Sequence, residues 1–140
     1  MKSLLIIEDD KHFATALGRI AADSLECEVA MAHTMKEGVH LAAIGGFDAI
    51  ILDLTLDDTN PAASVSEIDR LSLHAPVIVV TGETGESAGI LRNWAIFNGA
   101  TDFIQKDHIG IGHAWQLVMS NILNAKLRDK RDKANARAAA

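Results

Sequence analysis

The chain has 140 residues, 49% of them hydrophobic, which suits a single globular domain and argues against intrinsic disorder. Its formal charge is −6, but six of its 13 Lys and Arg residues and two of its 19 Asp and Glu residues follow residue 125. Residues 1–125 therefore carry a net charge of −10, which disfavours nucleic-acid binding. The single cysteine, Cys27, excludes an intrachain disulfide, and no segment approaches the roughly 20 apolar residues of a membrane span. We therefore expect a soluble, cytoplasmic protein.

Five short apolar segments predict β-strands. The segment from Ala49 to Leu52 is too short for a helix and rich in isoleucine, which is typical of a strand buried on both faces of a parallel sheet. It ends abruptly in a carboxylate, Asp53. In chain order, the expected strands cover residues 4–7, 27–31, 49–52, 75–80 and 102–105.

Helical patterns lie between these strands. Thr34, with Glu37 three residues later, has the spacing of a capping box, and Pro61 suits the first turn of another helix. The expected helices cover 11–24, 35–44, 61–73 and 86–98, with a last one that begins near 109–112. This alternation predicts a single α/β domain with one doubly wound, five-stranded parallel sheet. Beyond Leu127 the apolar stripe fades, so we expect the last helix to extend into solvent as a basic segment.

Chemically useful side chains follow four of the five strands: Glu8 and Asp9, then Asp53, Thr81 and Lys106. Because parallel strands end at the same edge of a sheet, we expect these groups to converge. Carboxylates are the hard oxygen ligands that Mg²⁺ takes, and Lys106 adds a compact positive charge. A carboxylate can also attack phosphorus and form an aspartyl-phosphate. The constellation therefore indicates a magnesium-assisted site for a phosphorylated aspartate.

Four motifs with this order and spacing resemble the receiver domain of two-component response regulators, over roughly residues 3–125. Each motif alone is weak, but the four together are specific. They are Ile7–Asp10, Asp48–Asp53, Val77–Gly82 and Gly99–Lys106. The resemblance implies a flavodoxin-like sheet with the strand order 2-1-3-4-5.

The resemblance also implies the roles of the site residues. Asp53 is the expected phosphoacceptor, and Mg²⁺ is expected on Asp9, Asp53 and the backbone carbonyl of Thr55, with Glu8 acting through water. Lys106 is expected to pair with the phosphoryl group. The phosphoryl group is expected to come from a histidine of a kinase or of a phosphotransfer protein. Such a domain is a phosphoacceptor with slow self-dephosphorylation and not an enzyme in the ordinary sense.

A switch and a partner surface follow from the same resemblance. Thr81 is expected to move toward the phosphoryl group while Phe103 turns inward. We expect residues 1–125 to form the receiver domain and residues 126–140 to form a basic helical extension or linker. The last helix offers a route to an output domain or to a homodimer, without direct contact to nucleic acid or membrane.

Two other functions remain open at this point. A phosphohydrolase of the haloacid dehalogenase type also uses Asp, Thr, Lys and Mg²⁺, but it needs a second Asp two residues after the nucleophile, where this chain has Thr55. An interaction module that resembles a receiver but is not phosphorylated is the other possibility, although such modules usually lack one of the site residues.

Several acidic residues near the site have simpler interpretations. Asp10 is more consistent with a solvated acid in the first turn of a helix than with a metal ligand. Asp57 and Asp58 are more consistent with solvated charges of a loop than with ligands. Asp107 stands where many receivers have proline after the lysine, so we expect a trans peptide there.

Overall fold

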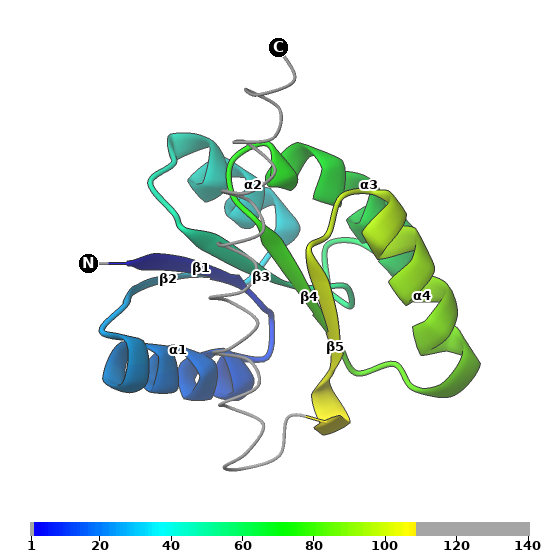
Figure 1. The fold of residues 1–140 in the computed structure, drawn as a ribbon, viewed down its shortest axis with the longest axis horizontal. Helices are drawn as coiled ribbons and strands as arrows, with labels where there is room; N and C mark the ends of the chain where they lie inside the picture. Colours follow the sequence, from blue (N-terminus) through cyan, green and yellow to red (C-terminus); the bar gives the residue numbers. More distant parts are fainter. Residues whose placement is uncertain (1, 109–140) are drawn as a thin grey trace, which may run out of the picture.

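The structure, a computed structural model, describes residues 2–108 (Figure 1). In this range strands and helices alternate, and a short 3-10 turn follows at Lys106–His108. The strands are β1 (Ser3–Ile7), β2 (Glu28–Ala32), β3 (Ala49–Asp53), β4 (Val77–Thr81) and β5 (Asp102–Gln105). The helices are α1 (Lys11–Leu25), α2 (Met35–Ile44), α3 (Pro61–Ser72) and α4 (Gly85–Phe97). The expected last helix and the expected extension at 126–140 lie outside the described residues.

The five strands form one parallel sheet in the order β2-β1-β3-β4-β5, which confirms the expected fold. β3 lies in the middle of the sheet, where Ile51 pairs with Ile6 of β1 on one side and with Ile78 of β4 on the other. Because all pairs are parallel, the strands end at the same edge. This edge carries the side chains that the sequence singles out.

Helices cover both faces of the sheet: α1 lies on one side, and α2, α3 and α4 lie on the other (Figure 1). Alternate residues of the central strands point into the two resulting cores. Ile50 and Leu52 belong to the core on the side of α2–α4, whereas Ile51 belongs to the core on the side of α1. All five residues of β3 are buried, as the unbroken apolar run predicts.

β5 and α2 have the expected boundaries, and the boundaries of the other elements differ from the expected ones by one or two residues. β2 begins at Glu28 instead of Cys27, which is buried just before the strand. β4 begins at Val77 because Pro76 has no N–H to donate to a neighbouring strand, although its carbonyl accepts a hydrogen bond from the Ile50 amide.

The helix ends follow the expected capping chemistry. The Thr34 hydroxyl accepts a hydrogen bond from the Glu37 amide at the start of α2, and Gly45 ends that helix with φ of 88°. Asn60 caps α3 directly before Pro61. None of the helices among residues 2–108 combines the length and the apolar character that crossing a membrane requires.

Gly38 of α2 lies directly against the sheet. A Cβ atom at this position would lie 2.7 Å from Cγ1 and 2.9 Å from Cγ2 of Ile7 in β1. These atoms belong to the branched base of a fully buried side chain, which cannot move away freely. The missing side chain of Gly38 therefore lets α2 pack directly on the end of β1, next to Glu8.

We expect Gly38→Ala to lower the free energy of unfolding by about 1 kcal/mol, although alanine favours helices, because overpacking costs about 1–3 kcal/mol. Gly89 of α4 is the matched control, since a Cβ atom there meets no atom within 4 Å. Gly89→Ala is expected to raise the free energy of unfolding by about 0.5–1 kcal/mol. Urea denaturation of both variants measures the two effects. An equal gain in both would contradict the close packing at Gly38.

Candidate functional site

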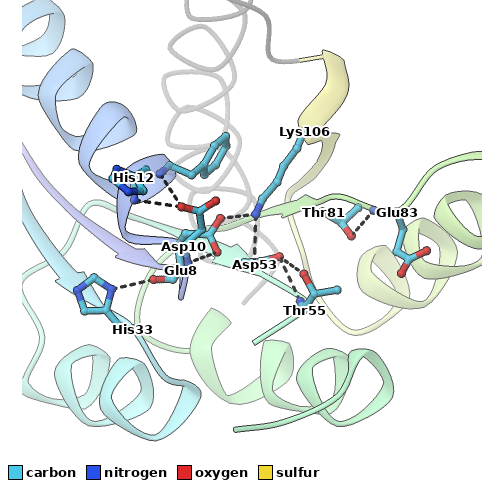
Figure 2. Close-up of polar contacts among 10 residues, drawn as sticks. Glu8, Asp10, His12, His33, Asp53, Thr55, Thr81, Glu83 and Lys106 are labelled. Carbon is cyan, nitrogen blue, oxygen red and sulfur yellow. Dashed lines mark hydrogen bonds and ion pairs between the residues drawn. The ribbon is translucent and has the colours of Figure 1, made fainter. Parts of the chain in front are cut away.

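Polar side chains converge at the carboxyl edge of the sheet (Figure 2). Glu8 directly follows β1, Asp53 ends β3, Thr81 ends β4 and Lys106 directly follows β5. The strands themselves are apolar, so their ends supply the polar groups at this edge.

The ammonium group of Lys106 lies between two carboxylates. It forms an ion pair with Oε1 of Glu8, and its Nζ is 3.4 Å from Oδ2 of Asp53. Nζ also lies 4.6 Å from the centroid of the Phe13 ring in α1, within range of a cation–π interaction. Within the described residues all peptide bonds are trans, which confirms the expectation for Lys106–Asp107.

The two carboxylates differ in their protonation. Both Glu8 and Asp53 are only 1% exposed. Burial raises the pKa of Glu8 to about 8, and a hydrogen bond to Asp53 adds to this shift, against the opposing effect of Lys106. Burial also works to raise the pKa of Asp53, but Glu8, Lys106 and Thr55 outweigh it and lower that pKa. The opposite pKa shifts favour the ionised form of Asp53 and, among the two carboxyl groups, place the proton-binding tendency on Glu8.

Thr55 orients the Asp53 carboxylate. Its amide N–H and its hydroxyl both donate to Oδ1 of Asp53, over 3.1 Å and 2.9 Å. This leaves Oδ2 as the oxygen that faces Lys106. The side chain of Asp53 is thus held from two opposite directions (Figure 2).

The arrangement suits a small divalent cation. Glu8, Asp9 and Asp53 can each offer a carboxylate oxygen within 4.8 Å of the other two. Lys106 offers one positive charge beside this cluster of carboxyl groups, so a cation would balance the remaining negative charge. Asp10 does not belong to this group. It is exposed and caps α1 through hydrogen bonds from the His12 and Phe13 amides, which confirms its interpretation as an acid at the start of a helix.

Thr81 and Phe103, the expected switch residues, differ in how deeply their side chains are buried. The Thr81 hydroxyl is buried and accepts a hydrogen bond from the Glu83 amide over 3.1 Å. Phe103 is half-buried and packs against the core on the side of α2–α4. In the sheet, Thr81 pairs with Gln105, so Phe103 lies two residues before the partner of Thr81 on β5.

Two residues near the site, His33 and Asp58, make contacts that the sequence did not predict. The Nδ1 atom of His33 lies 2.9 Å from the carbonyl oxygen of Glu8, and since a carbonyl can only accept, the ring donates this hydrogen bond. Asp57 and Asp58 are both exposed, as expected for charges of a loop. The carboxylate of Asp58 also accepts hydrogen bonds from the Met35 and Lys36 amides of α2, which was not expected. No periodicity or spacing relates residue 58 to residue 35, so only the folded chain reveals this contact.

Comparisons with known proteins agree with the fold. The family profile described as "Response regulator receiver domain" matches residues 4–110. The KDP operon transcriptional regulatory protein KdpE of Escherichia coli is 34% identical over 112 residues, which cover 80% of this chain and 47% of that protein. The chain spans between 37% and 55% of the length of the curated relatives that it matches.

Solved structures of other receivers are similar in shape. A receiver domain protein from Methanospirillum hungatei, described as CheY-like, has a TM-score of 0.74 and 21% identity, and the match covers 94% of this chain and 98% of that one. A response regulator from Burkholderia pseudomallei, with a phosphorylated aspartic acid, a calcium ion and citrate, has a TM-score of 0.70 and 22% identity. That match covers 96% of this chain and 75% of the other. From its fold and the profile match across residues 4–110, the chain belongs to the response regulator receiver domains of two-component systems.

Proposed function

We propose that this receiver domain is a phosphorylation-dependent switch and that Asp53 accepts the phosphoryl group. The observation that carries the proposal is the state of the Asp53 carboxylate at the end of β3. It is buried and ionised, it is oriented by Thr55 through Oδ1, and its Oδ2 faces the ammonium group of Lys106. An ionised and oriented carboxylate is the form that attacks phosphorus.

The proposed donor is a phosphohistidine of a histidine kinase or of a phosphotransfer protein. A carboxylate oxygen of Asp53 forms a bond to phosphorus while the bond from phosphorus to the imidazole nitrogen breaks. The bonding electrons stay on that nitrogen, which then takes up a proton, and Asp53 becomes an acyl phosphate. Lys106 already lies beside Asp53, so its charge is in place for the added negative charge of the phosphoryl group.

Mg²⁺ is the proposed cofactor. Asp9, Asp53 and the backbone carbonyl of Thr55 would hold it, with Glu8 acting through water, and the cluster of carboxylate oxygens supports this assignment. When bound, the ion supplies positive charge that offsets the negative charge of the phosphoryl oxygens. The phosphorylated aspartate and calcium ion of the Burkholderia pseudomallei protein are consistent with a site of this kind.

Phosphorylation is proposed to act on the pair formed by Thr81 and Phe103. The Thr81 hydroxyl would leave the Glu83 amide for the phosphoryl oxygens, and Phe103 would move inward from its half-buried position. The phosphoryl group thereby shifts the population toward a second conformation, since it contacts Thr81 in that state alone. Partners would distinguish the two conformations by the surface around Phe103.

The wider context of the domain is also proposed. Residues 1–125 would form the receiver domain and residues 126–140 a basic extension that leads to an output domain or to a homodimer. The single cysteine is consistent with a cytoplasmic location. The haloacid dehalogenase alternative finds no support in the structure, because Thr55 stands at the required Asp position and binds Asp53 with its hydroxyl.

We expect the protein to take up one phosphoryl group from a small phosphodonor in the presence of Mg²⁺, and Asp53→Asn to abolish the uptake because it removes the nucleophilic carboxylate. Mass spectrometry of the intact protein measures the product. Asp69→Asn, an exposed position on α3, is the control and should react like the unaltered protein. Equal uptake by the Asp53→Asn variant would reject the assignment, and steady turnover of a phosphomonoester would favour the hydrolase.

We expect Thr81→Ala to bind the phosphate mimic beryllofluoride but to lose the conformational response, because the hydroxyl that should follow the phosphoryl group is absent. Thr81→Ser should keep the response. Thr84, which begins α4 without a side-chain capping hydrogen bond, provides the control Thr84→Ala. NMR shifts of Phe103 with and without beryllofluoride and Mg²⁺ measure the response. An unchanged response in Thr81→Ala would show that the switch does not pass through Thr81. Failure of the unaltered protein to bind beryllofluoride would support the unphosphorylated interaction module.

We expect stability without divalent cations to fall as the pH rises from 4.5 to about 8, because folded Glu8 keeps its proton up to about pH 8 while unfolded Glu8 titrates near 4.5. Between these values the folded state binds more protons, so the free energy of unfolding decreases with pH. Glu8→Gln does not titrate, and its stability should decline less over this range. Urea denaturation at several pH values tests this, and parallel curves for the two proteins would contradict the raised pKa.

A further inference from the structure

The loop after Asp53 is fastened to a helix that is distant in the sequence. Oδ1 of Asp58 accepts a hydrogen bond from the Met35 amide over 2.9 Å, and Oδ2 accepts one from the Lys36 amide over 3.1 Å. Both donors belong to the first turn of α2, whose amides have no partner within the helix. A single carboxylate thus joins residues 54–60 to the start of α2.

This contact adds to an ordinary cap that α2 already has. Thr34 accepts a hydrogen bond from the Glu37 amide, so Asp58 supplies the two hydrogen bonds that Thr34 does not. The carboxylate also lies at the positive end of the helix dipole. The slight burial of Asp58 acts to raise its pKa, but hydrogen bonds from the Met35 and Lys36 amides outweigh this effect and lower the pKa. The contact is therefore one between an ionised carboxylate and a helix N-terminus.

The same loop carries groups of the candidate cation site. Thr55 binds the Asp53 carboxylate through its amide and its hydroxyl, and its backbone carbonyl is a proposed cation ligand. Three residues further along the same loop, the hydrogen bonds of Asp58 hold the chain against α2. Asp58 therefore acts on the position of a segment that the cation would contact.

The turn before α2 contacts the site directly, in addition to its link through Asp58. His33 donates a hydrogen bond to the carbonyl oxygen of Glu8, and the Glu8 amide donates to the carbonyl of Ala32 at the end of β2. The segment from Ala32 to Lys36 thus contacts the carboxylate-bearing segment after β1 and the loop after β3. Figure 2 shows the contact of His33 with Glu8. Both of these segments carry proposed cation ligands, so the start of α2 is a common support for them.

We propose that Asp58 is a positioning residue for the cation site. By fastening the loop after Asp53 to the first turn of α2, it couples cation binding at the sheet edge to the order of that turn. The proposal rests on the proposed function, because it takes Asp9, Asp53 and the Thr55 carbonyl as cation ligands. Coupling is reciprocal, so a cation at the site stabilises the first turn of α2 as much as an ordered turn favours the cation.

The test compares two variants that remove side-chain hydrogen bonds from the same helix end. Asp58→Ala removes the hydrogen bonds to Met35 and Lys36 together with the link to the loop, whereas Thr34→Ala removes only the cap at Glu37. Both should lower the melting temperature. Only Asp58→Ala should also weaken Mg²⁺ binding, by about tenfold as for other supports of metal ligands, and slow phosphate uptake from a small donor. Titration calorimetry of the full chain with Mg²⁺ measures the affinity.

Amide hydrogen exchange provides a readout that does not depend on phosphorylation. In the unaltered protein, Mg²⁺ should slow exchange at Met35 and Lys36 but not at Ala43, in the last turn of α2. Asp58→Asn keeps the size and one acceptor oxygen of the side chain while it removes the charge. It should show a smaller effect of Mg²⁺ at these two amides, and it replaces Asp58→Ala if that variant does not fold.

The possible failures can be told apart. If the unaltered protein binds Mg²⁺ and takes up phosphate, and Asp58→Ala binds Mg²⁺ as tightly as Thr34→Ala does, the coupling is overturned and the proposed function stands. Exchange at Met35 and Lys36 that does not respond to Mg²⁺ overturns the coupling in the same way. If the unaltered protein neither binds Mg²⁺ nor takes up phosphate, the proposed function fails and the coupling fails with it.

Discussion

The structure depends most on the contact of one ammonium group, that of Lys106, with two buried carboxylates at the edge of the sheet. Removing carboxylates from water is costly unless their charge is compensated. Here Lys106 contacts both Glu8 and Asp53, and burial together with the neighbouring Asp53 raises the pKa of Glu8. The consequence is chemical, because Asp53 remains ionised in a site that is largely shielded from solvent.

The fold supplies the geometry for this contact. A parallel sheet brings all strand ends to one edge, and strands that are apolar on both faces leave only their ends for polar groups. The packing of α2 on β1 at Gly38 brings that helix against the strand that precedes Glu8. The two cores hold the backbone on either side of β3, so Asp53 stands at the end of a strand that is buried along its whole length.

The loops around the site are held by polar contacts, and the loop after β3 is also held by the buried side chains of Leu54 and Leu56. Thr55 binds the carboxylate of Asp53, His33 binds the carbonyl of Glu8, and Asp58 binds the start of α2. The contacts of His33 and Asp58 join segments that are distant in the sequence and approach the same edge. The proposed function requires a change in conformation when Asp53 is phosphorylated, and hydrogen bonds of this kind can rearrange without a change in the core. The proposed role of Asp58 would add the start of α2 to the elements that respond, apart from Thr81 and Phe103.

The sequence by itself was sufficient to predict the sheet, its helices and the meeting of Glu8, Asp53 and Lys106, because strand patterns and parallel pairing place strand ends together whatever the side-chain details. The exact ends of the strands were predicted less accurately. Because Pro76 has no N–H to donate, for example, β4 begins at Val77 and not at the expected residue 75. Only the tertiary structure decided that the pKa of Glu8 is raised while that of Asp53 is lowered, and that Asp58 binds α2. Both depend on distances between segments that are far apart in the chain, and no local pattern encodes such distances.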